Sequence, residues 1–480
     1  MNSVKKNFMY NTAYQILILI IPLVTAPYLS RVIGAEGIGI YSYTYSIAYY
    51  FGLFILLGLN NYGNRKIAQV KDNKEKLSKE FLSIYLMQVM MSIIVIGIYG
   101  IYITLNNYTY KIIQVIQIVY LISVALDINW LFFGLEKFKI TVTRNFLIKI
   151  LTFICIFIFV KNEQDLWVYT LIMSLSYLIS QCCLFPFLKK IIQPVKVTFK
   201  DVIKHIKPNL ILFIPAISVS VYKVMDKIML GSMTNMTTVG FYENAEKIIN
   251  IPTTIITALG TVMLPRVSNL VSNGKEEEAK RYTDISMKFM MFLAIPFTLG
   301  IMAVIENLAP IYFGEDFALT GTFAKYLSLT LPFVSWANVI RTQYLLPKEK
   351  DKLYIVSIIS GAVINLVFNL ILIKQYQGMG AIISTIMAEF TVMIIQTVYV
   401  INKMNIKQYF KETVFFLIKG LIMYFLVISL ESWIENIIIL IILQVISGVL
   451  IYTILNYKYI YSLIKDFNPI KLDKRKVVKE

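Results

Sequence analysis

The chain has 480 residues, of which 58% are hydrophobic and only 15% are charged. A soluble protein would carry about 25% charged residues, and the apolar runs here are too many and too long for the buried helices of a soluble domain, so we expect a polytopic, all-α membrane protein. The net charge of +18 would suggest nucleic acid binding in a soluble protein. Because the basic residues fall in every second loop, membrane topology explains this charge, and we expect no nucleic acid partner.

Fourteen hydrophobic segments are predicted along the chain, most of them near the ~20 residues that a bilayer requires. In order, they cover residues 10–32, 40–63, 81–104, 112–134, 145–161, 166–188, 208–231, 239–263, 285–305, 321–345, 353–373, 379–401, 413–431 and 436–456. Alternate connections between them are basic, whereas the opposite connections hold only Lys111, Lys161, Lys325 and Lys374. By the positive-inside rule the basic side is cytoplasmic, so we expect both termini in the cytoplasm.

One layout occurs twice, about 200 residues apart. Three residues recur at a constant offset of 201, namely Gly39, Tyr41 and Arg65 as Gly240, Tyr242 and Arg266. Such repetition is typical of transporters that are built from two parallel halves. We therefore expect two pseudo-symmetric six-helix lobes plus two C-terminal helices. The predicted divisions are an N-terminal lobe with its linker (1–205), a C-terminal lobe (206–401), and the last two helices with a basic cytoplasmic tail (402–480).

Charged residues within the seventh and eighth predicted helices are the main site candidates. A charge at bilayer depth is unfavourable, so it usually has a partner or faces water. One interpretation is a structural cluster in which acids and bases neutralise one another. The other is a wet central cavity that binds an anion, and the two interpretations are compatible. The candidates are Lys223, Asp226 and Lys227 in the seventh helix and Glu243, Glu246 and Lys247 in the eighth.

Further charges lie at depth in other predicted helices. Asp127 in the fourth helix is followed by Arg144 and Lys149 in the fifth, which is consistent either with an ion pair or with a site that couples transport to an ion or proton. Glu389 in the twelfth helix is an equally ambiguous acid. Arg31, near the outer end of the first helix, either lines the cavity or extends its charge to the lipid interface.

Three basic residues lie on the predicted cytoplasmic side. Arg65 and Arg266 mark the ends of the second and eighth helices, where they either anchor the helices or form a cytoplasmic mouth that meets a phosphate. His205 is the only histidine, and its basic loop suggests a solvated side chain.

Sequence signals of an enzyme are missing. The chain has no G-x-x-x-x-G-K-[ST] motif and no nucleophile–base pattern, so we expect a transporter without a cofactor. The energy for transport would then come from a sodium or proton gradient or from consumption of the product. Buried carboxyl groups are the usual coupling groups, because burial can raise their pKa. Asp127 and Glu389 are preferred over Asp226 and Glu246, which have basic neighbours in the sequence.

Several stretches resemble one known family. YLSRVIGAEGIGIYSY (28–43), DINWLFFGLEKF (127–138), DKIMLG (226–231), GFYENAEKI (240–248) and MLPRVSNL (263–270) are similar to the bacterial polysaccharide repeat-unit flippases. These are the O-antigen and capsule translocases of the multidrug/oligosaccharidyl-lipid/polysaccharide exporter superfamily. The resemblance implies two lobes around a cavity that opens alternately to each side of the membrane.

The same resemblance implies the cargo, which is an oligosaccharide linked to undecaprenyl pyrophosphate and moved from the inner to the outer leaflet of the cytoplasmic membrane. Membrane lipid, a polysaccharide polymerase and the chain-length machinery are the partners that it implies. Three alternatives remain. A multidrug exporter of the same fold would favour an acidic cavity, a polymerase would carry a large outer loop, and a structural scaffold would not need the repeat or the buried charges.

Overall fold

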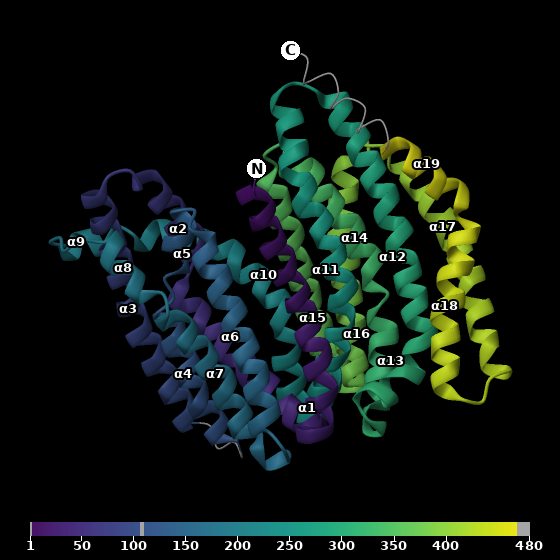
Figure 1. Cartoon of the computed structure of the whole chain (residues 1–480), viewed down its shortest axis with the longest axis horizontal. Coiled ribbons are helices and arrows are strands. Elements are labelled where there is room, and N and C mark those ends of the chain that lie inside the picture. The colour runs from purple at the N-terminus through teal and green to yellow at the C-terminus, as the bar shows by residue number, and fades with distance from the viewer. Residues whose placement is uncertain (1, 106–109, 468–480) are drawn as a thin grey trace. The chain divides into compact units, whose positions relative to one another are not determined.

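The computed structural model describes the backbone of residues 2–105 and 110–467, and within these ranges the side chains of all residues except 2–19, 214–216, 218, 219, 221–223 and 464–467. Every regular element in this part of the chain is a helix (Figure 1). The chain divides into two compact units. Unit 1 comprises Met1–Lys247 and Ile358–Ser384, and unit 2 comprises Ile248–Ser357 and Thr385–Glu480.

The helices of unit 1 follow the chain order with short connections. They are α1 (Asn2–Leu56), α2 (Leu59–Val70), α3 (Lys74–Leu105), α4 (Lys111–Ala125), α5 (Asn129–Gly134), α6 (Phe138–Phe159), α7 (Leu166–Cys182), α8 (Phe185–Ile191), α9 (Phe199–Ile203) and α10 (Ile206–Met233). Three helices are shared between the units, namely α11 (Met236–Ser272), α15 (Asp351–Tyr376) and α16 (Gly378–Val400). Unit 2 adds α12 (Glu276–Phe313), α13 (Ala318–Leu327), α14 (Thr330–Ile340), α17 (Ile406–Ile428), α18 (Ile437–Leu455) and α19 (Tyr457–Phe467).

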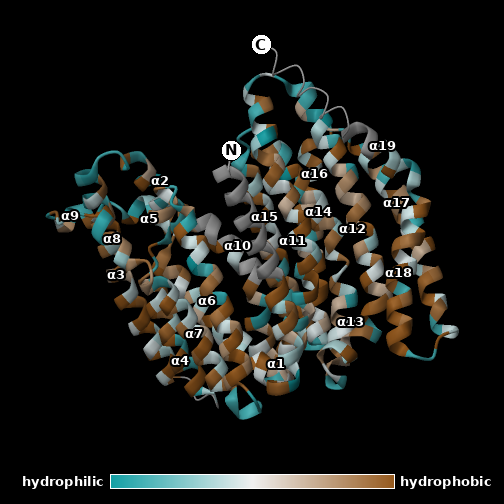
Figure 2. Ribbon diagram, in the orientation of Figure 1, coloured by the Kyte–Doolittle hydropathy of each residue, from teal (hydrophilic) through white to brown (hydrophobic). Residues whose placement is uncertain are grey.

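The surfaces of these helices suit lipid rather than water. In the described part of the chain, eleven helical stretches are long and apolar enough to cross a membrane. Large apolar side chains lie on their outer faces, for example Ile93 at 69% and Val449 at 63% exposed, and Figure 2 shows hydrophobic residues along α17 and α18. A soluble protein rarely exposes apolar surface on this scale. The prediction of an all-α, multi-pass membrane protein is therefore confirmed, whereas the number fourteen and the division into lobes stay predictions.

Several helices that were predicted as continuous are broken. The fourth predicted helix (112–134) separates into α4 and α5 at Leu126–Ile128, and the amide of Gln88 in α3 donates to the freed carbonyl oxygens of Val124 (2.9 Å), Ala125 (3.2 Å) and Asp127 (3.0 Å). Because a backbone carbonyl in lipid must be satisfied within the protein, the buried Gln88 side chain makes this break tolerable. Asp127 lies in the break itself.

The tenth predicted helix (321–345) is also broken, between α13 and α14. Pro332 lies in the first turn of α14 and has no N–H to donate to the carbonyl of Ser328. That carbonyl accepts instead from the backbone N–H of Leu331 at 3.0 Å, and the hydroxyl of Thr298 in α12 also lies 3.2 Å from it. Interrupted membrane helices are common in transporters, where the interruption usually lies beside a binding site.

Equivalent positions of the two repeats meet within unit 1. Gly39 of α1 packs on the backbone of Met236 in α11, and Gly240 of α11 packs on the backbone of Ala35 in α1. The hydroxyl of Ser42 donates to the carboxylate of Glu243 at 2.7 Å, and these two residues also differ by the offset of 201. The repeat that is visible in the sequence therefore corresponds to a crossing of two helices, whose glycines allow a close backbone approach.

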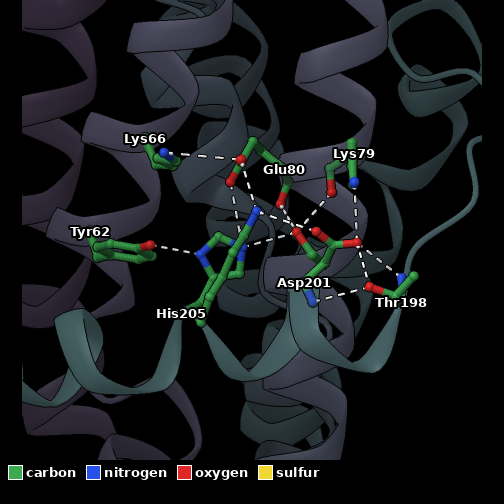
Figure 3. Close-up of polar contacts among 9 residues, drawn as sticks. Tyr62, Lys66, Lys79, Glu80, Thr198, Asp201 and His205 are labelled. Atoms are coloured by element: carbon green, nitrogen blue, oxygen red, sulfur yellow. Dashed lines mark hydrogen bonds and ion pairs between the residues drawn. The ribbon is translucent and has the colours of Figure 1, made fainter.

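The prediction that His205 is solvated is wrong, because its side chain is buried where the chain enters α10 (Figure 3). Ser83 of α3 uses its hydroxyl hydrogen on the carbonyl of Lys79 (2.8 Å), so it accepts from Nε2–H of His205 (2.9 Å). Nδ1 then accepts from the hydroxyl of Tyr62 in α2 (2.6 Å). This assignment describes a neutral imidazole, with the proton on Nε2.

Ion pairs surround this histidine. The carboxylate of Asp201 lies 3.2 Å from the ammonium of Lys79 (Figure 3). The carboxylate of Glu80 lies 3.2 Å from the ammonium of Lys204. Burial lowers the pKa of His205 to about 4, against the opposing effect of the nearby Glu80 carboxylate. The sequence around His205 is basic, but the His205 side chain packs among α2, α3 and α9. This burial depends on contacts with other helices, so no local sequence pattern indicates it.

The buried His205 is expected to make a contribution to the free energy of unfolding that depends on pH in the acid range. Between pH 6.5 and about 4 the unfolded chain binds a proton at His205 and the folded chain does not, so the free energy of unfolding falls as the pH is lowered through this window. The full contribution is on the order of 3 kcal/mol. We expect the thermal midpoint of the purified protein to fall more steeply from pH 7 to pH 4.5 than that of His205→Gln. Parallel curves for the two proteins would contradict the assignment.

Candidate functional site

A cavity of about 950 Å³ lies within unit 1, among α1, α2, α5, α6, α7, α10 and α11. A volume of this size can hold a large ligand headgroup. The charged residues of its wall are Asp127, Arg144, Lys149, Lys227, Glu243 and Lys247. The structure therefore brings residues from both parts of the predicted site to one space, although the functional role of these residues stays a prediction.

Helices α10 and α11 contribute a charge cluster in which acids and bases balance. The ammonium of Lys227 in α10 lies 2.7 Å from the carboxylate of Glu243 and 2.7 Å from that of Glu246, both in α11. Lys247 lies one turn after Glu243, with 3.6 Å between their charged atoms. Two positive and two negative charges thus neutralise one another at this end of the cavity. The paired arrangement that the sequence left open is present, and Lys227, Glu243 and Lys247 of this cluster also line the cavity.

This pairing determines how Lys227 can be studied. Removing one partner of a buried ion pair typically costs about 3–5 kcal/mol, because the other charge is left uncompensated. Substitution of Lys227 alone would strand the carboxylates of Glu243 and Glu246. Variants at this position therefore report first on folding, and are poor probes of binding.

Helices α5 and α6 form a second polar cluster, centred on Asn129. The amide of Asn129 donates to the carboxylate of Asp127 (2.6 Å), and its oxygen accepts from the guanidinium of Arg144 (3.0 Å). Arg144 also donates to the side-chain oxygen of Asn145, at 2.7 Å from Nη2. The acid and the base predicted from the sequence are therefore linked through an asparagine rather than by a direct bidentate pair.

The second cluster carries an excess of positive charge. Lys149 lies on the same wall, in α6, about one and a half turns after Arg144. Of the charged wall residues that the structure describes in α5, α6 and the preceding break, two are basic and one, Asp127, is acidic. Guanidinium and ammonium groups are well suited to hold phosphate oxygens. An anionic ligand would therefore be attracted to the α6 side of the cavity.

The other predicted residues whose side chains the structure describes do not line this wall. Asp226 and Glu246 are not among its lining residues, Arg31 is exposed and donates to the carbonyl of Pro27 at 3.4 Å, and Arg65 is exposed on α2. Arg266 in unit 2 lies over the ring of Tyr282, 4.4 Å from its centroid, and Glu389 is half-buried in α16 of unit 2. The side chain of Lys223 is outside the described residues.

Asp226 has buried polar neighbours that the sequence analysis missed. Its carboxylate accepts from the hydroxyl of Tyr242 (2.8 Å) and from the amide of Asn369 in α15 (2.6 Å). Asn365 lies one turn before Asn369, and its side-chain oxygen accepts from the Asn369 amide at 3.1 Å. All four side chains are at least half-buried, and both asparagines are inaccessible to solvent. Two asparagines four residues apart in an apolar helix were the signal that could have identified this cluster.

Two further groups of wall residues were missed. Tyrosines line the cavity from α1 and α7, and their spacing in α1, every fourth residue from Tyr41 to Tyr49, places them on one helical face. Carboxamides line it from α2, α5, α6 and α7. They are Asn60, Asn61, Asn64, Asn129, Asn145 and Gln181. The run NNYGN at 60–64 was a signal for the α2 group, whereas the others come together only through the packing of separate helices.

Comparisons with known proteins agree with this architecture. A family model described as “Polysaccharide biosynthesis protein” matches residues 4–271, and another, “MatE”, matches residues 212–371. The chain is 23% identical to a “Putative O-antigen transporter” of Shigella dysenteriae, over 78% of this chain and 94% of that one. It is 23% identical to a protein of the same name from Escherichia coli K12, over 83% of this chain and 97% of that one.

Solved structures share the fold at lower identity. “Lipid II flippase MurJ, inward closed conformation” has a TM-score of 0.70 and 16% identity, and the match covers 92% of this chain and 99% of that one. An inward-facing multidrug resistance MATE family transporter of the MOP superfamily has a TM-score of 0.58 and 13% identity, over 82% and 99% of the two chains. At these identities, the structural likeness establishes the fold alone.

Proposed function

Because this chain belongs to the polysaccharide biosynthesis protein family, whose model matches residues 4–271, we propose that it is a flippase for lipid-linked oligosaccharides. The cargo would be a capsule or O-antigen repeat unit linked to undecaprenyl pyrophosphate. The protein would move it from the inner to the outer leaflet of the cytoplasmic membrane by alternating access, with both termini in the cytoplasm. A polysaccharide polymerase and chain-length machinery would then use the flipped product.

The observation that carries this proposal is the excess of positive charge at Arg144 and Lys149 in a cavity within membrane-spanning helices. A diphosphate cannot cross the hydrocarbon region bare, because the loss of its hydration is too unfavourable. Basic side chains in a polar cavity replace that hydration with charge-assisted hydrogen bonds. The balanced cluster of Lys227, Glu243, Glu246 and Lys247 adds no net charge that would repel the anion.

A multidrug exporter is the second candidate, because the MatE model matches residues 212–371. Such a protein would bind organic cations and would favour an acidic cavity. The charged wall residues that the structure describes sum to a positive rather than a negative charge. This distribution favours an anionic cargo over a cationic drug.

Ion coupling is proposed at Asp226. Its carboxylate, together with the side-chain oxygens of Asn365 and Asn369 after rotation of the amides, offers the oxygen ligands that hard cations prefer. Of the two basic neighbours that argued against Asp226, Lys227 pairs with Glu243 and Glu246, and the side chain of Lys223 lies outside the described residues. Asp127 and Glu389 remain the alternatives. If neither a sodium nor a proton gradient changes the transport rate of reconstituted protein, the coupling proposal is wrong.

Ligand stabilisation tests the cargo assignment. Purified protein in lipid nanodiscs should be stabilised by undecaprenyl-pyrophosphate-linked oligosaccharide, by roughly 2–3 kcal/mol at a concentration about 100-fold above Kd. Tetraphenylphosphonium, an organic cation, should give no comparable shift in the thermal midpoint. Stabilisation by the cation and not by the lipid-linked oligosaccharide would replace the flippase with the multidrug exporter.

A further inference from the structure

An aromatic surface runs along one side of the cavity. Tyr41, Tyr45 and Tyr49 lie on one face of α1, and Tyr169 and Tyr177 of α7 lie against them. Their eight-residue spacing on each helix corresponds to a length of about 12 Å, which is longer than one pyranose ring. The three α1 rings and that of Tyr177 are only half-buried, so part of each ring faces the cavity.

Neighbouring aromatic rings hold this surface in place. The rings of Tyr41 and Tyr45 are nearly parallel, with 5.8 Å between centroids and 9° between planes, and those of Tyr45 and Tyr177 are 6.3 Å apart at 13°. Tyr120 supports Tyr45 from behind, at 5.1 Å. The hydroxyls of Tyr45 and Tyr177 lie 3.4 Å apart. Rings fixed in this way lose little conformational entropy when a ligand binds.

The carboxamide group follows the tyrosines along the cavity. On α7, Gln181 comes one turn after Tyr177, and its oxygen accepts from the amide of Asn129 at 3.3 Å. Asn129 in turn accepts from Arg144. Along the wall, the aromatic rings are therefore followed by carboxamides, and the carboxamides contact Arg144 of α6.

This arrangement of aromatic, carboxamide and basic residues matches the chemistry of a glycan attached to a diphosphate. A sugar ring presents C–H groups, which are attracted to the electron-rich faces of aromatic rings. Its hydroxyls donate and accept hydrogen bonds at once, as carboxamides do. A hydrophobic drug would not use the carboxamides, and a diphosphate would not use the rings.

We propose that the tyrosine and carboxamide surface binds the sugars of the cargo, with Tyr45 and Tyr177 as residues that recognise the glycan, while Arg144 and Lys149 hold its diphosphate. This inference rests on the proposed flippase function, and it divides that function between two surfaces. The glycan surface determines whether a sugar-bearing lipid is preferred over the bare lipid diphosphate. The basic surface determines whether either lipid binds.

Two lipid probes separate these surfaces. One is undecaprenyl pyrophosphate, and the other is a set of the same lipids bearing a disaccharide of glucose, galactose or N-acetylhexosamine. We expect at least one disaccharide to raise the affinity of the wild-type protein about tenfold over the bare lipid, as two stacking contacts would. In Tyr45→Leu/Tyr177→Leu this gain should vanish, while the affinity for the bare lipid stays unchanged. Tyr45→Phe, which keeps the ring, should retain most of the gain.

Tyr85→Leu is the matched control, because Tyr85 lies on α3 and does not line the cavity. Loss of the gain in this variant would show an indirect effect of packing, and would contradict the assignment. If the wild-type protein binds bare and glycosylated lipids equally, the glycan surface is refuted while the flippase proposal survives. If the wild-type protein binds neither lipid, the flippase proposal itself fails.

Discussion

Gly240→Ala is expected to prevent stable folding of unit 1. A methyl group on Gly240 would lie 2.8 Å from the carbonyl carbon of Ala35 and closer still to its oxygen, and neither backbone atom can rotate away. Gly39→Ala would meet the backbone of Met236 in the same way, 2.6 Å from its carbonyl carbon. The two helices must separate to admit either methyl group, so we expect a loss of about 3 kcal/mol or more for each variant. Size-exclusion profiles and the apparent thermal midpoint of detergent-purified protein measure this effect.

Gly97→Ala is the control for this substitution. Gly97 lies in α3, also in unit 1, and a methyl group there would meet nothing within 4 Å. Because alanine favours a helix by up to about 1 kcal/mol over glycine, this variant should be as stable as the wild type or more so. A Gly240→Ala protein that is monodisperse and as stable as Gly97→Ala would show that the close crossing of α1 and α11 is not present in the membrane.

Arg144→Gln/Lys149→Gln is expected to abolish transport while the protein still folds. Hydrogen bonds to a charged group contribute about 1.5–3 kcal/mol each, so losing both bases should lower the flipping rate at least about 100-fold. Glutamine retains a polar side chain that can still donate to Asn129 and Asn145, the partners of Arg144. The single variant Lys149→Gln should have a smaller effect, because Arg144 remains.

Lys139→Gln provides a control on the same helix. Lys139 lies near the start of α6, is exposed, and does not line the cavity. This variant removes one positive charge from α6 without changing the basic surface of the cavity, and it should transport at the wild-type rate. Equal rates for Lys139→Gln and the double variant would contradict the role assigned to Arg144 and Lys149.

The sequence predicted those features of the fold that depend on composition and on the repeat. Long apolar segments identified a multi-pass helical protein, and the offset between Gly39 and Gly240 marked residues that meet at a helix crossing. The breaks beside Asp127 and Ser328 were not predicted. They are stabilised by Gln88 and Thr298, which belong to other helices, so hydropathy along a single helix does not reveal them.

The candidate site was predicted only in part, for a related reason. Charges within apolar helices are conspicuous, so Arg144, Lys149 and Lys227 could be selected from the sequence and do line one cavity. Which acid pairs with which base depends on the rotation and packing of helices, and Asp226 turned out to contact Tyr242 and Asn369. Tyrosines and asparagines are common in membrane proteins, so the sequence alone does not distinguish those of the cavity wall from the others.

The most direct test of the central claim is a measurement of flipping in reconstituted vesicles. A fluorescent undecaprenyl-pyrophosphate-linked oligosaccharide is placed in both leaflets, and dithionite, which does not cross the membrane, reduces the label on the outer leaflet alone. With the wild-type protein, the label should be reduced in both leaflets, because the inner pool is moved outward during the measurement. Vesicles without protein, and those with Arg144→Gln/Lys149→Gln, should lose only the outer-leaflet signal. If the wild-type protein leaves the inner-leaflet signal intact, the chain does not translocate lipid-linked oligosaccharide and the account is wrong.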